Sequence, residues 1–316
     1  MMNEIINNNN QLADGFNPEQ TIDGFLRSQD VKESTKKGYR RQLRPFFKWL
    51  ETIDKDNALQ REDILEYKLY LKKEGKSAST INAYLTVVRK FFKWLSSKNH
   101  NINNIAEDIK NVKTSQEHKK SALIDSQVKE LLDSINISTM TGKRDYAMIK
   151  TMLYLGLRTI EVSRLKIKDI EPYMGQMSIS IHGKGREEKD QRMFIHEDLM
   201  KSIHDYLKAR EEDDNEEDYS ENDYIFISHA TNRSSKQLTT RSIRRIVKKL
   251  LKGIGLNTRK YSAHSLRHTA ITKADEISNN PRFTQNFARH ARFDTTTRYI
   301  AERNKLENAV ELKIHY

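Results

Sequence analysis

Hydrophobic side chains recur with helical spacing along most of the chain, and the first hundred residues show four such segments. The expected helix boundaries come from the polar residues at the start of each segment and from the glycine that follows the third segment. Pro45 lies inside the second segment and should kink it, because proline cannot donate to the preceding turn. The expected helices are a short one containing Phe25 and Leu26, one from Ser34/Thr35 through 39–53, one over 61–75 stopped at Gly75, and one from Ser79/Thr80 over 81–98.

Two of these segments repeat each other at an offset of 45 residues, since 34–50 and 79–95 share Ser, Thr, Tyr, an Arg and the whole Phe-Phe-Lys-Trp-Leu block. Two copies are too few for a solenoid. They either present similar aromatic faces to one bundle core, which is the favoured interpretation, or reflect a functional duplication. In the bundle, the residues expected to meet are Phe46, Trp49 and Leu50 from one helix and Phe91, Trp94 and Leu95 from the other.

Basic side chains separate these aromatic residues and should face outward. A helical unit with such a surface could clamp DNA, mostly through phosphates. The candidate DNA-binding residues are Lys36, Arg40, Arg44, Arg89 and Lys90.

The pattern then changes, and residues 101–122 are polar, rich in lysine and poor in large apolar side chains, as in a linker. A second domain, 123–299, should follow the N-terminal domain, 17–100, and a tail, 1–16, is too polar to fold. The second domain should be mostly helical around a small β-hairpin or sheet, where Met177, Ile179 and Ile181 alternate before a turn at Gly183–Gly185. The other expected elements are a helix from Asp125, helices over 144–156, 158–165 and 197–210, and a short strand or buried connector over 224–227.

Composition narrows the function. The 316 residues suffice for two domains, and 56 Lys and Arg against 44 Asp and Glu give a formal charge of +12, which favours an anionic polymer as partner. The acidic run 211–223 is interpreted as a solvated loop, so the remainder is more basic still. The chain has no cysteine, which excludes disulfides, cysteine nucleophiles and thiolate zinc sites. Without an apolar run of membrane-spanning length or a leader-like start, an intracellular, cytoplasmic protein is expected.

Four segments place cationic or proton-transferring groups at abrupt starts of structure: GLR with Arg158, HGKG with Lys184, HSLRH with His264 and Arg267, and a last segment in which Tyr299 follows His290 by nine residues. Each has a plainer explanation alone. Arg158 could pair with Glu161, and Lys184 could be a solvated turn residue. His264 and His268 could suggest a metal pair, but no third ligand stands at a recognisable spacing, and His268 is expected to support packing.

The order of these groups over about 140 residues resembles the catalytic set of the tyrosine recombinases, the phage integrase family. The strings LGLRTIEVSRL, starting at Leu155, and HSLRH, starting at His264, carry the resemblance. It covers essentially the whole chain and implies an N-terminal SAM-like core-binding domain before the catalytic one. The chain departs from the family where it reads Ala288-Arg289-His290 in place of the frequent Leu-Gly-His, a difference that concerns the local packing more than the role of the histidine.

The resemblance implies six catalytic residues, and physical chemistry agrees with their roles. Arg158 and Arg267 would stabilise the phosphate charge, because guanidiniums are permanently charged and can each bind two oxygens. Tyr299 would attack; its phenol needs a proton acceptor and cationic surroundings. The remaining expected roles are His264 as general base, His290 as hydrogen-bond donor to the phosphate, Lys184 as acid for the leaving 5′ oxygen and Glu161 as a secondary, orienting residue.

This chemistry requires no metal and no cofactor. Three functions compete: a site-specific recombinase acting on double-stranded DNA sites through a 3′-phosphotyrosine and a Holliday junction; a type IB topoisomerase-like enzyme that reseals one duplex; and a silent DNA-binding protein, which would be expected to lose a reactive residue. Residues 300–316 are expected to form an amphipathic helix that docks into a neighbouring subunit of a homo-tetramer, or that packs on its own domain. Integration, excision, inversion and dimer resolution remain open, with a slight lean towards a two-domain, Xer-like resolvase.

Overall fold

The fold is described from a computed structural model. It covers residues 17–53, 59–98, 104–114, 120–182, 191–213, 220–229 and 237–290, together with Phe293, Thr296 and Thr297. The described chain is mainly helical with one small sheet and divides into two compact units, 1–115 and 116–316, each described by itself below. The unit boundary lies inside the predicted linker, 101–122.

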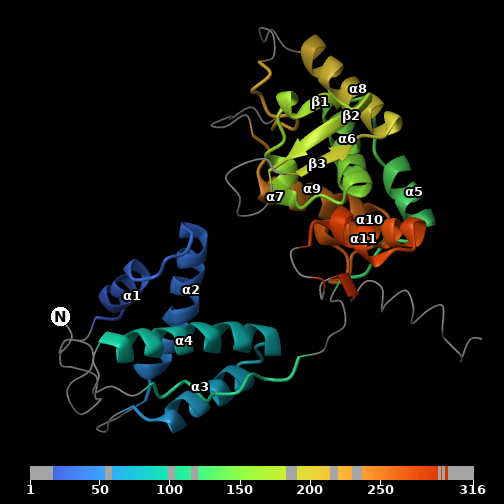
Figure 1. Cartoon of the computed structure of the whole chain (residues 1–316). Coiled ribbons are helices and arrows are strands. Elements are labelled where there is room, and N and C mark those ends of the chain that lie inside the picture. The colour runs from blue at the N-terminus through green and yellow to red at the C-terminus, as the bar shows by residue number, and fades with distance from the viewer. Residues whose placement is uncertain are drawn as a thin grey trace, which may run out of the picture. The chain divides into compact units, whose positions relative to one another are not determined.

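The N-terminal unit contains the four predicted helices: α1 (Pro18–Arg27), α2 (Glu33–Leu50), α3 (Arg61–Lys73) and α4 (Ala78–Lys98). Helix α1 packs on α2, and α4 packs against both α2 and α3 (Figure 1). Pro45 is accommodated within α2, and Gly75, with φ +68°, follows the end of α3 as predicted. The α2 and α4 helices start one or two residues before the expected Ser/Thr caps.

An aromatic core holds this unit together, because the repeated Phe-Phe-Lys-Trp-Leu blocks of α2 and α4 both contribute to it. Phe47 meets Phe91 edge-on with ring centroids 5.3 Å apart, and Phe46 meets Phe92 at 6.0 Å. Such edge-to-face pairs add to the hydrophobic gain of burial. The bundle-core interpretation of the repeat is therefore confirmed, although Trp94 lies against Phe25 of α1, at 5.8 Å.

Residues 104–113, part of the predicted linker, pack onto the N-terminal unit. Ala106 and Ile109 are buried in its core. The Asn82 side chain donates to the Val112 carbonyl at 2.8 Å and accepts from the Val112 N–H at 2.7 Å. Arg89 donates to the Ile109 carbonyl at 2.7 Å. This segment is thus a structural part of the first unit.

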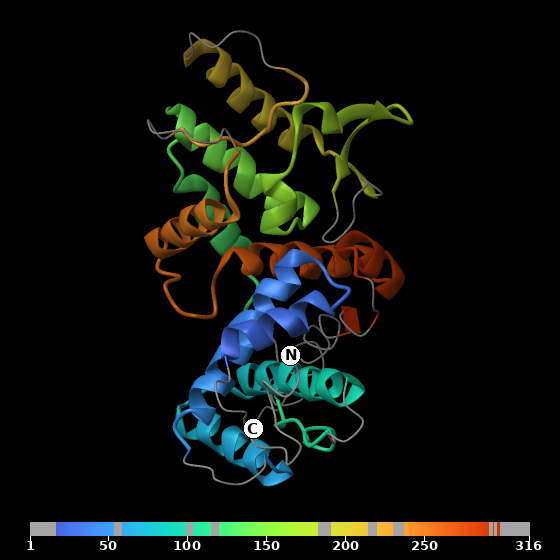
Figure 2. The ribbon, with the colours of Figure 1, turned by 90° about the vertical axis from the view of Figure 1, so that its left-hand side faces the viewer.

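The C-terminal unit is built around α6 (Met140–Leu155), which packs against α8 (Glu197–Asp213) and α10 (Ala263–Ser278). Helix α11 (Pro281–Ala288) lies beside α10 in both ribbon views (Figures 1 and 2). The remaining helical elements are α5 (Asp125–Asp133), α7 (Thr159–Ser163), α9 (Thr240–Gly253) and the 3-10 turn η1 (Ile167–Asp169).

The sheet has three antiparallel strands in the order β1 (Ile170–Tyr173), β2 (Gln176–Ile181) and β3 (Gln191–Phe194). Ile179 lies opposite both Ile170 and Met193, and it is fully buried. The alternation that predicts a strand at Met177–Ile181 is confirmed, and β1 is an added strand that pairs through the turn at Met174–Gly175. Residues 224–227 form a buried connector with isolated bridges at both ends.

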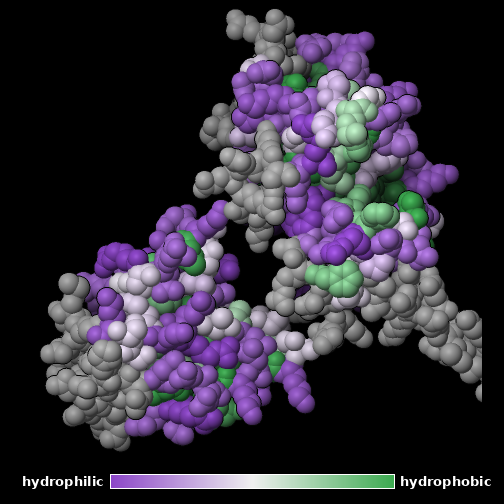
Figure 3. Space-filling view, in the orientation of Figure 1, coloured by the Kyte–Doolittle hydropathy of each residue, from purple (hydrophilic) through white to green (hydrophobic). Residues whose placement is uncertain are grey.

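The face of each unit that Figure 3 shows is mostly hydrophilic, in keeping with the large number of charged residues. Within the described ranges, no helix combines the length and apolar character that crossing a membrane requires.

Candidate active site

The site begins where helix α6 ends and α7 starts. Gly156 closes α6 in the left-handed conformation, with φ +56°, and a Cβ there would come within 3.1 Å of the Phe287 ring. Arg158 is the N-cap of α7, and its N–H donates to Oε2 of Glu161 at 2.8 Å. Its guanidinium donates from Nη1 to Oε1 of the same carboxylate at 2.8 Å. The predicted Arg158–Glu161 pair is therefore present.

Arg158 keeps part of its guanidinium outward. Its side chain is 32% exposed, whereas Glu161 is 1% exposed. Among the described residues, Nη2 and Nε of Arg158 have no hydrogen-bond acceptor. The arginine is thus held by one edge and can offer the other edge to an anion.

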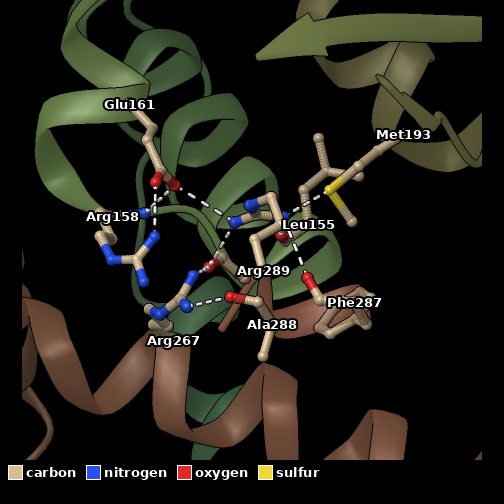
Figure 4. Close-up of polar contacts among 9 residues, drawn as sticks. Leu155, Arg158, Glu161, Met193, Arg267, Phe287, Ala288 and Arg289 are labelled. Atoms are coloured by element: carbon tan, nitrogen blue, oxygen red, sulfur yellow. Dashed lines mark hydrogen bonds and ion pairs between the residues drawn. The ribbon is translucent and has the colours of Figure 1, made fainter. Parts of the chain in front are cut away.

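Arg267 lies on α10 and is buried, with 2% exposure. Its Nη1 donates to the Gly156 carbonyl at 2.5 Å, and its Nη2 donates to the Ala288 carbonyl (Figure 4). These carbonyls belong to the ends of α6 and α11, so one guanidinium joins three elements. Helix C-terminal carbonyls favour cations, which explains why a charged side chain is tolerated here.

The two histidines approach the arginines from different elements. His264 lies on the first turn of α10 and is exposed, while His290 follows α11 and is half-buried. His290 Nδ1 lies 3.0 Å from the Thr296 hydroxyl. Burial lowers the pKa of His290 to about 4, and the nearby charges of Arg267, Arg158, Arg289 and His264 act in the same direction. The imidazole is therefore neutral at pH 7 and can act as a hydrogen-bond donor or acceptor.

Arg289 is a member of this cluster that the sequence analysis did not assign a role. It has φ +54°, a conformation that costs a non-glycine residue about 1–2 kcal/mol. Its side chain is only 4% exposed and donates to the carbonyls of Leu155 and Gly156, each at 3.1 Å, and to Glu161 Oε2 at 3.2 Å (Figure 4). The unusual Arg in Ala288-Arg289-His290 was the available signal.

Glu161 is the anion around which the arginines are arranged. Burial alone would raise the pKa of Glu161, but the Arg289 charge, the Arg158 N–H and the Arg158 guanidinium outweigh burial and hold the pKa below its ordinary value. Burial lowers the pKa of Arg289 and Glu161 opposes this change, and a guanidinium keeps its charge in proteins. The buried carboxylate is thus ionised and neutralised by two guanidiniums.

The structure brings together Arg158, Glu161, His264, Arg267 and His290 in the second unit, as expected. Lys184, Tyr299 and the segment 300–316 lie outside the described residues, so their predicted roles remain predictions. His268 is buried on α10 with Nδ1 3.4 Å from the Thr272 hydroxyl, which agrees with a packing role. No group of three or more possible metal-ligating His, Cys, Asp or Glu side chains occurs in the described ranges.

The candidate DNA-binding residues of the first unit have protein partners. Arg44 Nε donates to Glu19 at 2.7 Å, and Arg40 bridges Glu19 and Asp23, all near the protein surface. Lys36 pairs with Glu33 at 3.2 Å, and Lys90 lies over the Tyr39 ring at 5.9 Å. Exposed ion pairs contribute little and exchange readily, so these contacts leave the predicted DNA role open.

A further basic surface lies on α9, which the sequence analysis did not single out. Ile243, Val247 and Leu251 are fully buried, and this period of four residues turns the cations of the helix outward. The pattern was readable in the sequence as TRSIRRIVKKLLKG. The exposed cations of α9 are Arg241, Arg244, Arg245, Lys249 and Lys252.

The site contains two guanidiniums and two imidazoles at helix ends, beside a neutralised carboxylate and close to the basic helix α9. This combination suits a nucleic-acid phosphodiester. Such a site is typical of phosphoryl-transfer enzymes that act on DNA. Comparisons with known proteins identify the family. The "Phage integrase family" model matches residues 122–305, and the "Phage integrase, N-terminal SAM-like domain" model matches residues 23–99.

The chain belongs to the phage integrase family, the tyrosine recombinases. It is 28% identical over 285 residues to tyrosine recombinase XerD of Listeria innocua, covering 88% of this chain and 92% of the relative. It is 33% identical over 184 residues to tyrosine recombinase XerC of Caldanaerobacter subterraneus, covering 58% of this chain but only 48% of that relative. A TnP I resolvase of Bacillus thuringiensis is 26% identical over 91% of this chain and 96% of its own length.

Solved structures share the fold. The XerH site-specific recombinase bound to a palindromic difH substrate has a TM-score of 0.74 at 20% identity, with 93% of this chain and 84% of that chain covered. A lambda integrase dimer bound to a COC′ core site has a TM-score of 0.67 at 15% identity, with 89% and 76% covered. The fold and the family make the chain a tyrosine site-specific recombinase, and its relatives do not favour a type IB topoisomerase.

Proposed function

We propose that this chain cuts and rejoins double-stranded DNA at specific sites, with Tyr299 as the nucleophile. The convergence of Arg158, Arg267, His264 and His290 at the ends of α6, α10 and α11 supports this function most directly. Arg158 lies more than 100 positions before the other three residues in the sequence, yet together they supply the permanent cations and imidazoles that phosphodiester attack requires. Relatives named as XerD recombinase and as resolvase align over almost their whole lengths.

In the proposed reaction, the Tyr299 phenol loses its proton to His264 as its oxygen bonds to the scissile phosphorus. Arg158 and Arg267 stabilise the added negative charge on the non-bridging oxygens, and His290 donates a hydrogen bond. The bond to the 5′ oxygen breaks, and Lys184 supplies the proton that this leaving oxygen takes. The 3′-phosphotyrosine keeps the energy of the broken bond, so a 5′ hydroxyl of a partner duplex can attack it and restore Tyr299.

Subunits of this enzyme would assemble as a homo-tetramer on two duplexes, exchanging the segment 300–316 between neighbours, and would act in the cytoplasm. The α9 cations would contact phosphates close to the cleavage position, with Arg40, Arg44 and Arg89 of the first unit as further contacts. The TnP I resolvase, which aligns over 96% of its own length, favours resolution among the uses of this chemistry. The reaction needs no metal and no cofactor.

The decisive experiment offers the protein a pool of nicked suicide duplexes with a randomised core and looks for protein–DNA adducts that survive denaturant. Wild type should form adducts in the presence of a chelator, and Tyr299→Phe should form none because the benzyl ring lacks the attacking oxygen. Tyr316→Phe is the matched control and should retain the adduct. An adduct that persists in Tyr299→Phe and disappears in Tyr316→Phe would overturn the choice of nucleophile.

Duplexes recovered from the pool then test recombination. Two labelled copies should yield four-way junctions that resolve to exchanged strands. Relaxation of supercoiled plasmids without any junction would instead indicate a topoisomerase and contradict the proposal.

A further inference from the structure

Arg289 contacts the active site without access to a bound DNA. Its side chain is 4% exposed, and its guanidinium donates to the carbonyls of Leu155, Gly156 and Phe287, each at 3.1 Å, and to the Glu161 carboxylate. A side chain so enclosed cannot bind a scissile phosphate. Any effect on the reaction must therefore pass through the groups that it holds.

Those groups include direct partners of both phosphate-binding arginines (Figure 4). The Gly156 carbonyl accepts from Arg289 at 3.1 Å and from Arg267 at 2.5 Å. The Glu161 carboxylate accepts from Arg289 at 3.2 Å and from Arg158 at 2.8 Å. Arg289 thus links the two catalytic guanidiniums through one carbonyl and one carboxylate.

The way in which the two carboxylate oxygens of Glu161 are shared between their hydrogen-bond donors determines how Arg158 is held. Oε2 accepts from the Arg289 guanidinium and from the Arg158 N–H, which leaves Oε1 for the Arg158 guanidinium. A carboxylate with both oxygens available tends to bind arginine through two parallel hydrogen bonds. Without Arg289, Glu161 would draw a second N–H of Arg158 away from the phosphate.

We propose that Arg289 is a positioning residue: by occupying Glu161 and the α6 carbonyls, it makes Arg158 present its outer edge to the scissile phosphate. This role rests on the proposed function. Glycine would adopt the positive φ of residue 289 without steric cost, but it would leave Glu161 with Arg158 as its single cationic contact among the described residues. The side chain of Arg289, rather than its backbone, therefore supplies the function.

The first test needs no DNA and compares wild type, Arg289→Gly, Glu161→Gln and the double variant by thermal unfolding at pH 5 and pH 8. Removing the Arg289 charge leaves a buried carboxylate undercompensated, so the folded protein should hold a proton on Glu161 that the unfolded chain releases. The stability deficit of Arg289→Gly should therefore be larger at pH 8 than at pH 5, by about a few °C. When the Glu161→Gln change is already present, only the smaller change through His290 should remain, because the Arg289 charge also lowers the pKa of His290. The pH dependence of the deficit should therefore shrink, and equal pH dependence with and without Glu161 would overturn the coupling.

The second test measures adduct formation under single-turnover conditions on a duplex recovered from the randomised pool. Arg289→Gly should slow cleavage by about 10- to 100-fold with little change in DNA binding, the range expected for a misplaced catalytic group. The double variant should cleave faster than Arg289→Gly, because the neutral amide no longer competes for Arg158. Arg289→Lys, which keeps the charge but cannot reach all five acceptors of the guanidinium, should remain stable and still cleave slowly.

The outcomes separate the two proposals. If wild type forms no adduct with any duplex, the proposed function fails and the positioning role fails with it, whereas the pH test still reports on the Arg289–Glu161 pair. If wild type, Arg289→Gly and Arg289→Lys all cleave at the same rate, recombination stands and the role of Arg289 is refuted. Slow cleavage that the added Glu161→Gln substitution does not relieve would also refute it.

Discussion

A neutral histidine within a group of arginines is the residue-scale feature with the clearest experimental consequence. Burial and the adjacent guanidiniums lower the pKa of His290 to about 4, against an ordinary value of 6.5. Between these two pH values the unfolded chain binds a proton that the folded protein does not. Stability contributed by His290 is therefore complete above about pH 6.5 and is lost as the pH falls towards 4.

Replacing His290 with Gln should remove this part of the pH dependence. On going from pH 7 to pH 5, we expect the melting temperature of wild type to fall by about a few °C more than that of His290→Gln. The measurement is thermal unfolding by circular dichroism at constant ionic strength. His204→Gln, a change at an exposed position of α8, is the matched control and should parallel wild type. A constant difference between wild type and His290→Gln would contradict the expected protonation behaviour.

At the scale of the element, the end of α6 sets where the arginines of the candidate site can lie. Gly156 adopts φ +56° and offers its carbonyl to both Arg267 and Arg289. The position that a side chain would occupy at Gly156 is closely packed, since a Cβ would lie 3.1 Å from Phe287 and 3.4 Å from Ala270. The helix end is therefore restricted by conformation and by packing together.

We expect Gly156→Ala to destabilise the second unit by about 2–4 kcal/mol, combining the left-handed backbone cost with overpacking against α10 and α11. Gly255→Ala is the matched control, because Gly255 has φ +79° and nothing within 4 Å of its Cβ position. It should cost only the backbone part, about 1–2 kcal/mol. Denaturant titration of both variants measures the difference, and equal losses would show that the contact with Phe287 is unimportant.

The elements also show what the sequence could predict and what it could not. The start of α3 and the glycine-terminated ends of α3 and α6 were located closely because their signals are local, whereas α6 starts at Met140, four residues before the predicted start at 144. The strand β1 was missed because it is only four residues long, contains Pro172 and is mostly exposed, so it has no alternation of its own. Its strand character comes from pairing with β2, which is a tertiary effect.

The residues of the candidate site, like the helices, could be predicted where a local motif marks them. Arg158, His264, Arg267 and His290 could be named from their motifs, and Glu161 from its spacing to Arg158. The role of Arg289 depends on a left-handed backbone and on carbonyls 133 and 134 positions away, which no local pattern encodes. Similarly, the pairing of Arg40 and Arg44 with Glu19 and Asp23 required the packing of α1 on α2.

At the scale of the whole molecule, the first unit extends along the chain beyond the end of its last helix, α4. Residues 104–113 bury Ala106 and Ile109 and satisfy hydrogen bonds of Asn82 and Arg89. On the other side, the Leu123 N–H donates to the Thr269 hydroxyl of α10 at 2.7 Å, and that hydroxyl donates to the Ser265 carbonyl. Residues 104–113 of the predicted linker are thus part of the first unit, while Ser121 near its other end donates from its N–H to the Lys260 carbonyl of the second unit at 3.2 Å.

A fragment comprising residues 17–114 should therefore be more stable than one comprising residues 17–98. We expect the difference to be about 3–5 kcal/mol, from one buried isoleucine, one buried alanine and the hydrogen bonds of Asn82 and Arg89. Urea titration of the two fragments measures the difference. Asn111→Ala in the longer fragment removes the exposed hydrogen bond that Arg89 donates to Asn111 at 2.8 Å, and so measures the surface share of this difference. Coincident transitions would show that the segment adds nothing to the fold.

The exposed cations of α9 also make the proposed enzyme sensitive to its ionic surroundings. Every phosphate neutralised by a lysine or arginine releases condensed counterions, so affinity falls with salt by a power of about 0.9 for each contact. If all five exposed cations of this helix bind phosphates, α9 alone makes affinity fall as roughly the 4.5th power of salt concentration. The enclosed arginines at positions 267 and 289 already have carbonyl partners, which salt does not displace. Binding of DNA would thus weaken as ionic strength rises, while the arrangement of the arginines in the active site would not change.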